Sequence, residues 1–530
     1  MQSKYYRDLR EHLAALEERG KLVRIQRQVN KDTELMPLVR WQFRGLEEDQ
    51  RKAFLFENVV DVKGNKYSMP VSVGTLAAST EIYALGLMCK PEEIHDKWTN
   101  AQLNAQPPVT VSSGPVHEVI WKGNDLLNGH GLEMLPVPIS TPGFDNAPYL
   151  TSANWVSKDP ESGVYNIGNY RGQIKGPNRT GGFFTGQHMG QHWRKCMAMG
   201  KPLEAAVIVG SVPAVAYAAT AKVPYDFDEY RLAGGLAGEP IELVKCVTVD
   251  IEVPATAEIV IEGVIPTDYV EPEGPFGEYT GYLGPRGHSP YMEVTAITHR
   301  KNAIYSALIS QFPPSESSKI KHTGTEQILY KYLRYDSGND CVLDVALHDE
   351  VSGSGQSYCV IKTKKRNTAE VWRALHATAG FVGPFAKITI AVDEDIDIFD
   401  PAMVNWAICF NVVPDKDVAI AKGKYAGLDP SAAPPTATNA ERRAAEMTSL
   451  LIDATRPWPY LPVSLPRKEF MENAKAIWEE LKLPPLKPRK PWYGYSLGVW
   501  SEQDMEEAEL ALRGDHFVTG EKAKANRIKP

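Results

Sequence analysis

The sequence predicts a multi-domain α/β protein, α+β in arrangement. A β-rich centre over residues 126–315 is expected between an N-terminal α/β region, 1–125, and a C-terminal α/β domain, 316–530. At 530 residues the chain exceeds what one hydrophobic core usually covers. Its composition, 43% hydrophobic and 23% charged, is that of an ordinary globular protein. Apolar residues recur at helical spacing near both ends and alternate as in strands between them.

The N-terminal region begins with a predicted helix over residues 7–19. Leu9, Leu13 and Leu16 recur at helical spacing. Gly20 is a suitable end for this helix, because glycine adopts a left-handed backbone without strain. The segment KLVRIQRQV follows and is predicted to be a strand.

The central region is predicted to be an antiparallel barrel or sandwich. IELVKCVTVDIEV alternates as a strand does, and AEIVIEGVI is expected to pair with it across the turn PAT. MEVTAITH is expected to return through RKN to AIYSALI. The longest apolar stretch, AAVIVGSVPAVAYAATA, is broken by Ser211 and Pro213, so it predicts a buried strand entering a helix rather than a membrane span.

Helical patterns return after the breaker FPPSES. In RKEFMENAKAIWEELKL the apolar residues that share one helical face are Phe470, Ala474, Ile477 and Leu481. In SEQDMEEAELALRG, Ser501 is a predicted N-cap and Gly514 a stop. These segments predict a terminal helical arm for oligomerisation.

Charge and cysteine usage exclude several classes of function. The net charge of −8 argues against nucleic-acid binding, which normally needs a basic face. The six cysteines form no C-x-x-C pair, which disfavours a disulfide framework or a thiolate zinc site. The N-terminus has charges throughout and no apolar core typical of a signal peptide. We therefore expect a cytoplasmic protein without nucleic-acid or membrane partners.

The segment EPEGPFGEYTGYLGP carries two acids, Glu273 and Glu278, among Gly274, Pro275 and Gly277. So much glycine and proline does not form a regular helix or central strand, which predicts a turn with a fixed backbone path. One interpretation is a solvated acidic loop, since glutamate is seldom buried without a partner. The other is a functional pair of acids.

A second informative stretch, residues 159–195, contains His188 and His192 four positions apart. On a helix they would share a face and could bind a metal, although such pairs are also common on surfaces. The turn VPYDFDEYRLAGG adds Asp226, Asp228 and Glu229, which are either solvated or a source of a hard oxygen ligand. A mixed Asn/His/Glu site would suit Mn²⁺, Mg²⁺ or Fe²⁺ better than a structural zinc.

Five motifs, in order, closely resemble the UbiD family of decarboxylases, which includes ferulic acid decarboxylase. They are N-x-G-x-Y-R at residues 166–171, a downstream QH, HWRK, DEYRLAGGLAGEPIELVK and EGPFGEYTGY. Weaker echoes are NWAICFNVVPDKDVAI and LLIDATRPWP. The resemblance implies a central domain similar to the flavin-reductase split β-barrel. It also implies prenylated FMN, a divalent metal on the cofactor phosphate and a potassium ion (K⁺).

The resemblance also implies the reaction and its residues. The reaction is reversible, non-oxidative decarboxylation of an aromatic or α,β-unsaturated acid through a covalent prenylated-FMN adduct. Glu278 would donate the proton, with Glu273 as the second acid and Arg171 pairing with Glu273 and orienting the substrate carboxylate. Two acids held close can raise a carboxyl pKa enough for this task. The implied metal ligands are Asn166, His188 and Glu229. The implied cofactor contacts are Asn166, Asn169, Tyr170, Arg171, Gln187 and His188.

Other expectations stay open at this point. His192 either has a direct role or simply faces the phosphate region from the next helical turn. A flavin prenyltransferase would supply the cofactor, and the enzyme would be a homo-oligomer, either a dimer or a hexamer. Many relatives carry a lysine before the DAT motif, whereas this chain has Thr448 and Ser449, so that contact is either missing or supplied by another residue such as Lys422 or Arg443.

The segment SESSKIKHTG predicts the substrate class. By resemblance it runs near the substrate side of the flavin, where Lys319, Lys321 and His322 would add positive charge. This favours an aromatic acid with a further polar or anionic group, including a CoA thioester such as phthaloyl-CoA. The alternative is a solvated lysine-rich loop.

Three rival functions remain. They are an FMN-dependent reductase on the same barrel, a metal-dependent hydrolase using His188, His192 and an acid, and a non-catalytic assembly scaffold.

Overall fold

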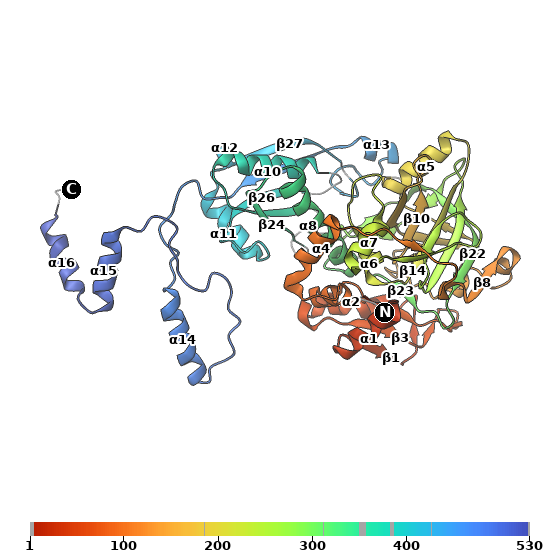
Figure 1. Cartoon of the computed structure of the whole chain (residues 1–530), viewed down its shortest axis with the longest axis horizontal. Coiled ribbons are helices and arrows are strands. Elements are labelled where there is room, and N and C mark those ends of the chain that lie inside the picture. The colour runs from red at the N-terminus through yellow and green to blue at the C-terminus, as the bar shows by residue number, and fades with distance from the viewer. Residues whose placement is uncertain are drawn as a thin grey trace. The chain divides into compact units, whose positions relative to one another are not determined.

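The computed structural model describes residues 5–184, 186–310, 312–348, 357–381, 386–425 and 427–527 (Figure 1). The chain divides into two compact units. The first comprises Met1–Ala391 and Ala419–Ile452, and the second comprises Val392–Val418 and Asp453–Pro530. The limits 1–125, 126–315 and 316–530 stay a prediction.

The predicted N-terminal helix is α1 (Leu9–Glu18). Asp8 caps it by accepting a hydrogen bond from the backbone N–H of Glu11, and Gly20 follows with a φ of 67°. Its buried leucines share one face. The other N-terminal elements are β1 (Leu22–Ile25), β2 (Val29–Asn30), α2 (Leu35–Gly45), β3 (Ala53–Phe56), β4 (Val59–Val60), β5 (Lys66–Tyr67), β6 (Val71–Val73), α3 (Thr80–Gly86) and α4 (Ile94–Leu103).

A four-stranded sheet of order β1-β3-β6-β23 lies in this region. Its last strand, β23 (Tyr305–Ala307), comes from the end of the central region and pairs with β6 in parallel. The predicted return of MEVTAITH into AIYSALI within one sheet is therefore wrong. Burial explains the difference, because β23 is buried throughout and completes the N-terminal sheet instead.

The centre is a nine-stranded sheet of order β11-β10-β14-β17-β22-β13-β12-β9, with β8 also paired to β22. The strand pairs within it are antiparallel. Its members are β8 (Val119–Lys122), β9 (Tyr149–Leu150), β10 (Asn154–Lys158), β11 (Tyr165–Asn169), β12 (Gly172–Gly176), β13 (Arg179–Gly181), β14 (Leu203–Val209), β17 (Ile259–Ile265) and β22 (Tyr291–His299).

IELVKCVTVDIEV is not one strand paired with AEIVIEGVI, which corrects the prediction. It forms the hairpin β15 (Glu242–Lys245) and β16 (Glu252–Pro254), which joins β7 (Val109–Thr110) in a separate sheet. The backbone N–H groups of Val247 and Thr248 donate to the buried Glu262 carboxylate at 2.9 and 2.7 Å. These bonds hold the turn that breaks the alternating segment in two.

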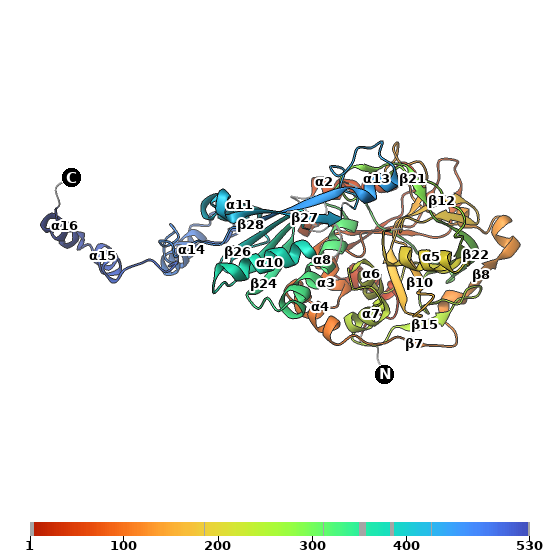
Figure 2. The same cartoon turned by 90° about the horizontal axis from the view of Figure 1, so that it is seen from above.

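Three helices cover parts of the central sheet: α5 (His188–Ala198), α6 (Pro213–Thr220) and α7 (Glu229–Ala237). Figures 1 and 2 both show α5 against β10. The long apolar stretch divides into β14 and α6 as predicted, since Pro213 is at the first turn of the helix. None of the described helices is long and apolar enough to cross a membrane.

The acidic Gly/Pro segment forms two short hairpins rather than an open loop. Their strands are β18 (Glu271–Glu273), β19 (Phe276–Gly277), β20 (Leu283–Gly284) and β21 (Gly287–Ser289). β18 pairs with β21, and β19 pairs with β20. Glu273 and Glu278 are thus placed by backbone pairing.

The C-terminal part of the chain contains a five-stranded sheet of order β24-β25-β26-β28-β27. Ser315 caps the helix α8 (Glu316–Lys331), which precedes this sheet. The remaining elements of the sheet region are β24 (Val342–Leu347), β25 (Tyr358–Thr363), α10 (Thr368–Gly380), β26 (Ile388–Asp393), β27 (Val418–Tyr425), α13 (Asn439–Ala444) and β28 (Glu446–Asp453).

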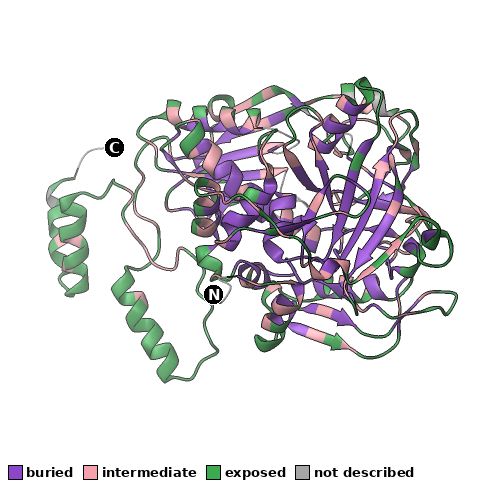
Figure 3. Cartoon of the chain, turned by 45° about the vertical axis from the view of Figure 1, so that its right-hand side comes forward, coloured by how far each residue is buried: buried purple, intermediate pink, exposed green. Residues whose placement is uncertain are grey.

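The second unit holds α11 (Pro401–Asn411), α12 (Pro414–Asp417) and the two predicted terminal helices, α14 (Lys468–Glu480) and α15 (Glu502–Leu512). A further helix, α16 (His516–Ala525), follows that the sequence analysis did not predict. Ser501 caps α15, and Gly514 follows it with a φ of 83°, as predicted. Neither α14 nor α15 has a buried residue, and Figure 3 shows both as exposed.

Candidate active site

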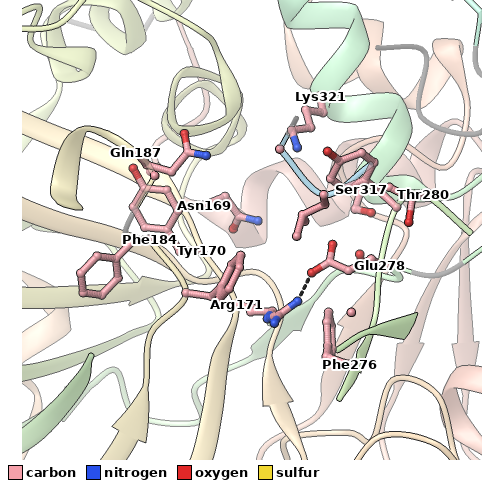
Figure 4. A pocket seen from close by; sticks show the side chains of 18 of the residues that line it. Asn169, Tyr170, Arg171, Phe184, Gln187, Phe276, Glu278, Thr280, Ser317 and Lys321 are labelled. Carbon is pink, nitrogen blue, oxygen red and sulfur yellow. Dashed lines mark hydrogen bonds and ion pairs between the residues drawn. The ribbon is translucent and has the colours of Figure 1, made fainter. Parts of the chain in front are cut away.

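A cavity of about 360 Å³ lies within the first unit. Its wall comes from β11 and the residues after it, the starts of α5 and α7, the end of α6, the short hairpins, α8 and the segment 427–442. Polar side chains from these separate elements point into one space (Figure 4). Convergence of this kind is typical of a ligand site.

Arg171 joins both predicted acids. Its Nε and Nη2 donate to the two carboxylate oxygens of Glu273 at 2.8 and 2.6 Å, and its Nη1 contacts Glu278. All three residues are buried, and the exposed fraction is 2% for Glu273 and 7% for Glu278. Burial alone would lower the pKa of Arg171, but the two carboxylates outweigh it and raise this pKa. The solvated-loop interpretation is therefore wrong.

The local sequence explains how the guanidinium is held. Arg171 lies in the short link between β11 and β12, and its guanidinium carbon lies 4.1 Å from the ring centroid of Phe183 and 5.3 Å from that of Phe276. A side chain at Gly284 would crowd both Arg171 and Glu278, so this glycine allows their approach. Glu278 lines the cavity, whereas Glu273 does not. Glu273 positions the arginine that Glu278 contacts.

Asn166, His188 and Glu229 meet at another part of the wall. Glu229 accepts hydrogen bonds from Asn166 Nδ2 and from the backbone N–H of Ile167, both at 2.9 Å. His188 Nδ1 lies 4.0 Å from Glu229 Oε1. Burial raises the pKa of Glu229 to about 8 and lowers that of His188 to about 4. A buried carboxyl and a neutral imidazole are ligands for a divalent cation.

These three side chains fit the implied metal by their donor chemistry: an amide oxygen, an imidazole nitrogen and a carboxylate. Within the described ranges no group of three or more His, Cys, Asp or Glu residues could hold a metal. Asn166 completes this set from outside those residue types.

The wall also fits an anionic cofactor. Asn169 Oδ1 is buried and accepts no hydrogen bond from the part of the chain that the structure describes, so it suits an N–H or O–H donor of a bound cofactor rather than its anionic group. Lys222 lines the cavity and donates to Gln187 Oε1 at 3.0 Å, while no described carboxylate forms an ion pair with it. Burial lowers the pKa of Lys222 to about 7, and a phosphate would supply the missing negative charge. A side chain at Gly168 would clash with the Tyr170 ring, so the glycine is needed for Tyr170 to occupy its position in the cavity wall.

His192 has a structural position. It lies one turn after His188 on α5 but does not line the cavity. Its Nδ1 is 2.9 Å from Ser157 Oγ, and its Nε2 is 3.7 Å from Asp159 Oδ2. Two of the acidic residues considered with it are also structural, since Asp226 accepts from Ser162 Oγ and Asp228 caps α7.

The predicted lysine-rich segment is the start of α8 and not a loop. Lys321 lines the cavity, whereas Lys319 pairs with Glu48 at 3.1 Å and His322 is buried elsewhere. Lys422 is exposed and away from the cavity. The side chain of Arg443 lies outside the described residues.

Sequence reasoning missed several residues of the wall. Lys222 was hidden because it directly follows the apolar stretch that was interpreted only as strand and helix. Arg442 lines the cavity beside the position where a replacement contact was expected. Phe183, Tyr279 and Ser317 complete the wall without a recognisable spacing in the sequence.

Comparison with known families identifies the chain as an enzyme of the carboxy-lyase class. Family models of 3-octaprenyl-4-hydroxybenzoate carboxy-lyase match in three parts: the N-terminal domain at residues 13–102, the Rift-related domain at 108–313 and the C-terminal domain at 326–454. The chain belongs to the UbiD family of decarboxylases.

Solved structures resemble the chain over nearly its whole length. The UbiD-class enzyme HmfF from Pelotomaculum thermopropionicum, an evolved dimeric form in complex with prFMN, is 33% identical with a TM-score of 0.75, covering 89% of this chain and 100% of that chain. The closed form of vanillic acid decarboxylase from Sedimentibacter hydroxybenzoicus is 29% identical with a TM-score of 0.76, covering 90% of this chain and 99% of that chain.

A sequence relative gives the same picture. An uncharacterized protein of Aquifex aeolicus is 32% identical over 503 residues, which are 90% of this chain and 99% of the relative's own length.

Proposed function

We propose that the protein is a reversible, non-oxidative decarboxylase of aromatic or α,β-unsaturated carboxylic acids that uses prenylated FMN. The observation that carries the proposal is the buried Arg171, held against Glu273 and Glu278 at the cavity. A guanidinium there binds a carboxylate, and a neighbouring carboxyl group delivers a proton. The matched families are carboxy-lyases, which favours this function over a reductase, a hydrolase or a scaffold.

The chain's own residues would divide the work. Arg171 orients the substrate carboxylate, and Glu278 holds the proton that replaces CO₂. Asn166, His188 and Glu229 would hold a divalent ion, Mn²⁺, Fe²⁺ or Mg²⁺, against the cofactor phosphate, with K⁺ as a further cation. Asn169, Tyr170, Gln187 and Lys222 would contact the cofactor. When bound, prenylated FMN supplies the electron sink for decarboxylation.

Finer features belong to the same proposal. The curled nine-stranded sheet would be a split barrel like that of flavin reductases, and the enzyme would act in the cytoplasm. The exposed helices α14–α16 would join copies into a homo-oligomer, a dimer or a hexamer. The HmfF neighbour is described as a dimeric form, which supports self-association in this family.

Purification after co-expression with a flavin prenyltransferase tests the function. We expect a coloured enzyme that releases CO₂ from at least one aromatic or unsaturated acid, whereas enzyme made without the transferase does not. A fully loaded enzyme that exchanges no CO₂ with a broad panel of such acids would overturn the proposal. An enzyme that is active without any flavin would overturn it too.

A further inference from the structure

Lys321 lies on α8 with its side chain in the cavity, where the described residues offer it no ion-pair partner. Two other cations nearby have carboxylate partners: Arg171 pairs with Glu273 and Glu278, and Lys319 pairs with Glu48. Ser317, one helical turn before Lys321, lines the same wall. A cationic head with a polar neighbour thus faces the space.

The position of the ammonium group is defined by an aromatic ring. Lys321 Nζ lies 4.1 Å from the centroid of the Tyr279 ring, and Tyr279 directly follows Glu278. Burial lowers the pKa of Lys321 to about 8, against the opposing influence of Glu278, so the amine is still largely protonated at neutral pH. Figure 4 shows Lys321 reaching in from α8, across the cavity from Gln187.

Two lysines of the cavity, Lys222 and Lys321, have no ion-pair partner among the described residues; they are near enough for Lys321 to help lower the pKa of Lys222, but they contact different groups. Lys222 is held by Gln187 beside the predicted metal ligands, which is the side suited to the cofactor phosphate. Lys321 is beside Glu278, the proposed proton donor, and therefore on the side where the substrate must lie. A half-buried cation that forms no direct ion pair with the described residues is unfavourable, and an anionic ligand in contact with it relieves that cost.

We propose that Lys321 binds a second anionic group on the substrate, so that the enzyme prefers aromatic acids carrying two acidic groups. The inference rests on the proposed decarboxylase function and names the substrate class of that site. One acid faces Arg171 and is lost as CO₂, while the other stays on the product and pairs with Lys321. The second group is either a ring carboxylate or the phosphates of an acyl-CoA thioester, because both present anionic oxygens to an ammonium.

Binding measured without turnover tests the inference. The variant is Lys321→Met, which keeps length and loses charge, and the matched control is Lys319→Met on the same helix. Calorimetry on enzymes made without the transferase and loaded with FMN, which are not expected to decarboxylate, would use benzene-1,3-dicarboxylate and its monomethyl ester, with a carboxybenzoyl-CoA thioester as a third ligand. We expect Lys321→Met to weaken the dianionic ligands by about 10- to 100-fold, and the monoester by less than about twofold, as for loss of one charge-assisted hydrogen bond.

The outcomes distinguish a ring carboxylate from the phosphates of a CoA thioester, and they distinguish failure of the Lys321 inference from failure of the proposed decarboxylase function. A loss confined to the dicarboxylate identifies a ring carboxylate, and a loss confined to the thioester identifies its phosphates. Equal affinity of wild type and Lys321→Met for both dianionic ligands would overturn the inference, as would an equal loss in Lys319→Met. Failure of the wild type to release CO₂ from any acid refutes the function instead. If Lys321→Met does not fold, Lys321→Gln takes its place, and Lys321→Arg is expected to restore binding.

Discussion

Arg171 and Glu273 form a two-pronged ion pair inside the protein, with Nε and Nη2 donating to opposite oxygens of the same carboxylate at 2.8 and 2.6 Å. Removing the guanidinium leaves Glu273 and Glu278 buried without a cation. We expect Arg171→Met to lower the free energy of unfolding by about 3 to 5 kcal/mol in chemical denaturation. Arg179→Met, a largely exposed control, should change it by less than about 1 kcal/mol. Equal losses would refute the structural role of the pair.

Glu278 is the expected proton donor. Glu278→Gln keeps the shape of the side chain and removes its acidic proton, so turnover should fall by about 100-fold or more while the flavin stays bound. Steady-state CO₂ release and the visible spectrum measure the two effects. Glu271→Gln, on the neighbouring hairpin and absent from the cavity wall, is the control. Near-normal turnover in Glu278→Gln would assign the proton to another group.

Glu229 should control both the metal and the flavin. Glu229→Ala removes the only carboxylate of the proposed ligand set, so the phosphate would lose its neighbouring cation. We expect metal analysis and absorbance to show loss of both groups, and a chelator to release flavin from the wild type. Glu242→Ala, an exposed acidic control, should retain both. Full occupancy in Glu229→Ala would contradict the ligand assignment.

Lys222 should contribute to cofactor affinity. Its ammonium is next to Gln187 and lacks a carboxylate partner among the described residues, so it is available to a phosphate. Lys222→Met is expected to weaken flavin binding by about 10-fold or more, measured by fluorescence titration. The exposed Lys201→Met should bind as the wild type does. If the two variants bound flavin equally, Lys222 would have another role.

The protein should become less stable in mild acid because of His12, which does not line the cavity. His12 is fully buried, its Nε2 donates to Thr75 O at 2.7 Å, and burial lowers its pKa from 6.5 to about 4. Below pH 6.5 His12 is protonated in the unfolded chain but stays neutral in the folded chain. The free energy of unfolding therefore falls as the pH drops from 6.5 to 4. The loss from this residue approaches about 3 kcal/mol. Denaturation at pH 7 and pH 4.5 measures it, and His12→Gln should show a shallower dependence. An unchanged slope would assign the acid sensitivity to other groups.

Local signals in the sequence were enough for several elements. The leucine spacing and Gly20 determine α1, Pro213 divides the apolar stretch into β14 and α6, and Ser501 with Gly514 delimits α15. Caps, proline and helical periodicity act within a few residues, so no distant part of the chain is needed to interpret them. Strand partners are different, because alternation marks a strand without naming its neighbour. This is why the pairing of β23 with β6 was not foreseen.

The same division holds at the site. The motifs alone brought forward Arg171, Glu273 and Glu278 as residue types suited to carboxylate and proton chemistry, but only the tertiary structure showed that they touch. The sequence does not show which of Lys319 and Lys321 lines the cavity. Two positions along a helix turn a side chain by about 200°, so one lysine faces Glu48 and the other faces the cavity. The sequence by itself determined which chemistry is present, and the packing of α8 against α4 and α6 decided which lysine can take part in it.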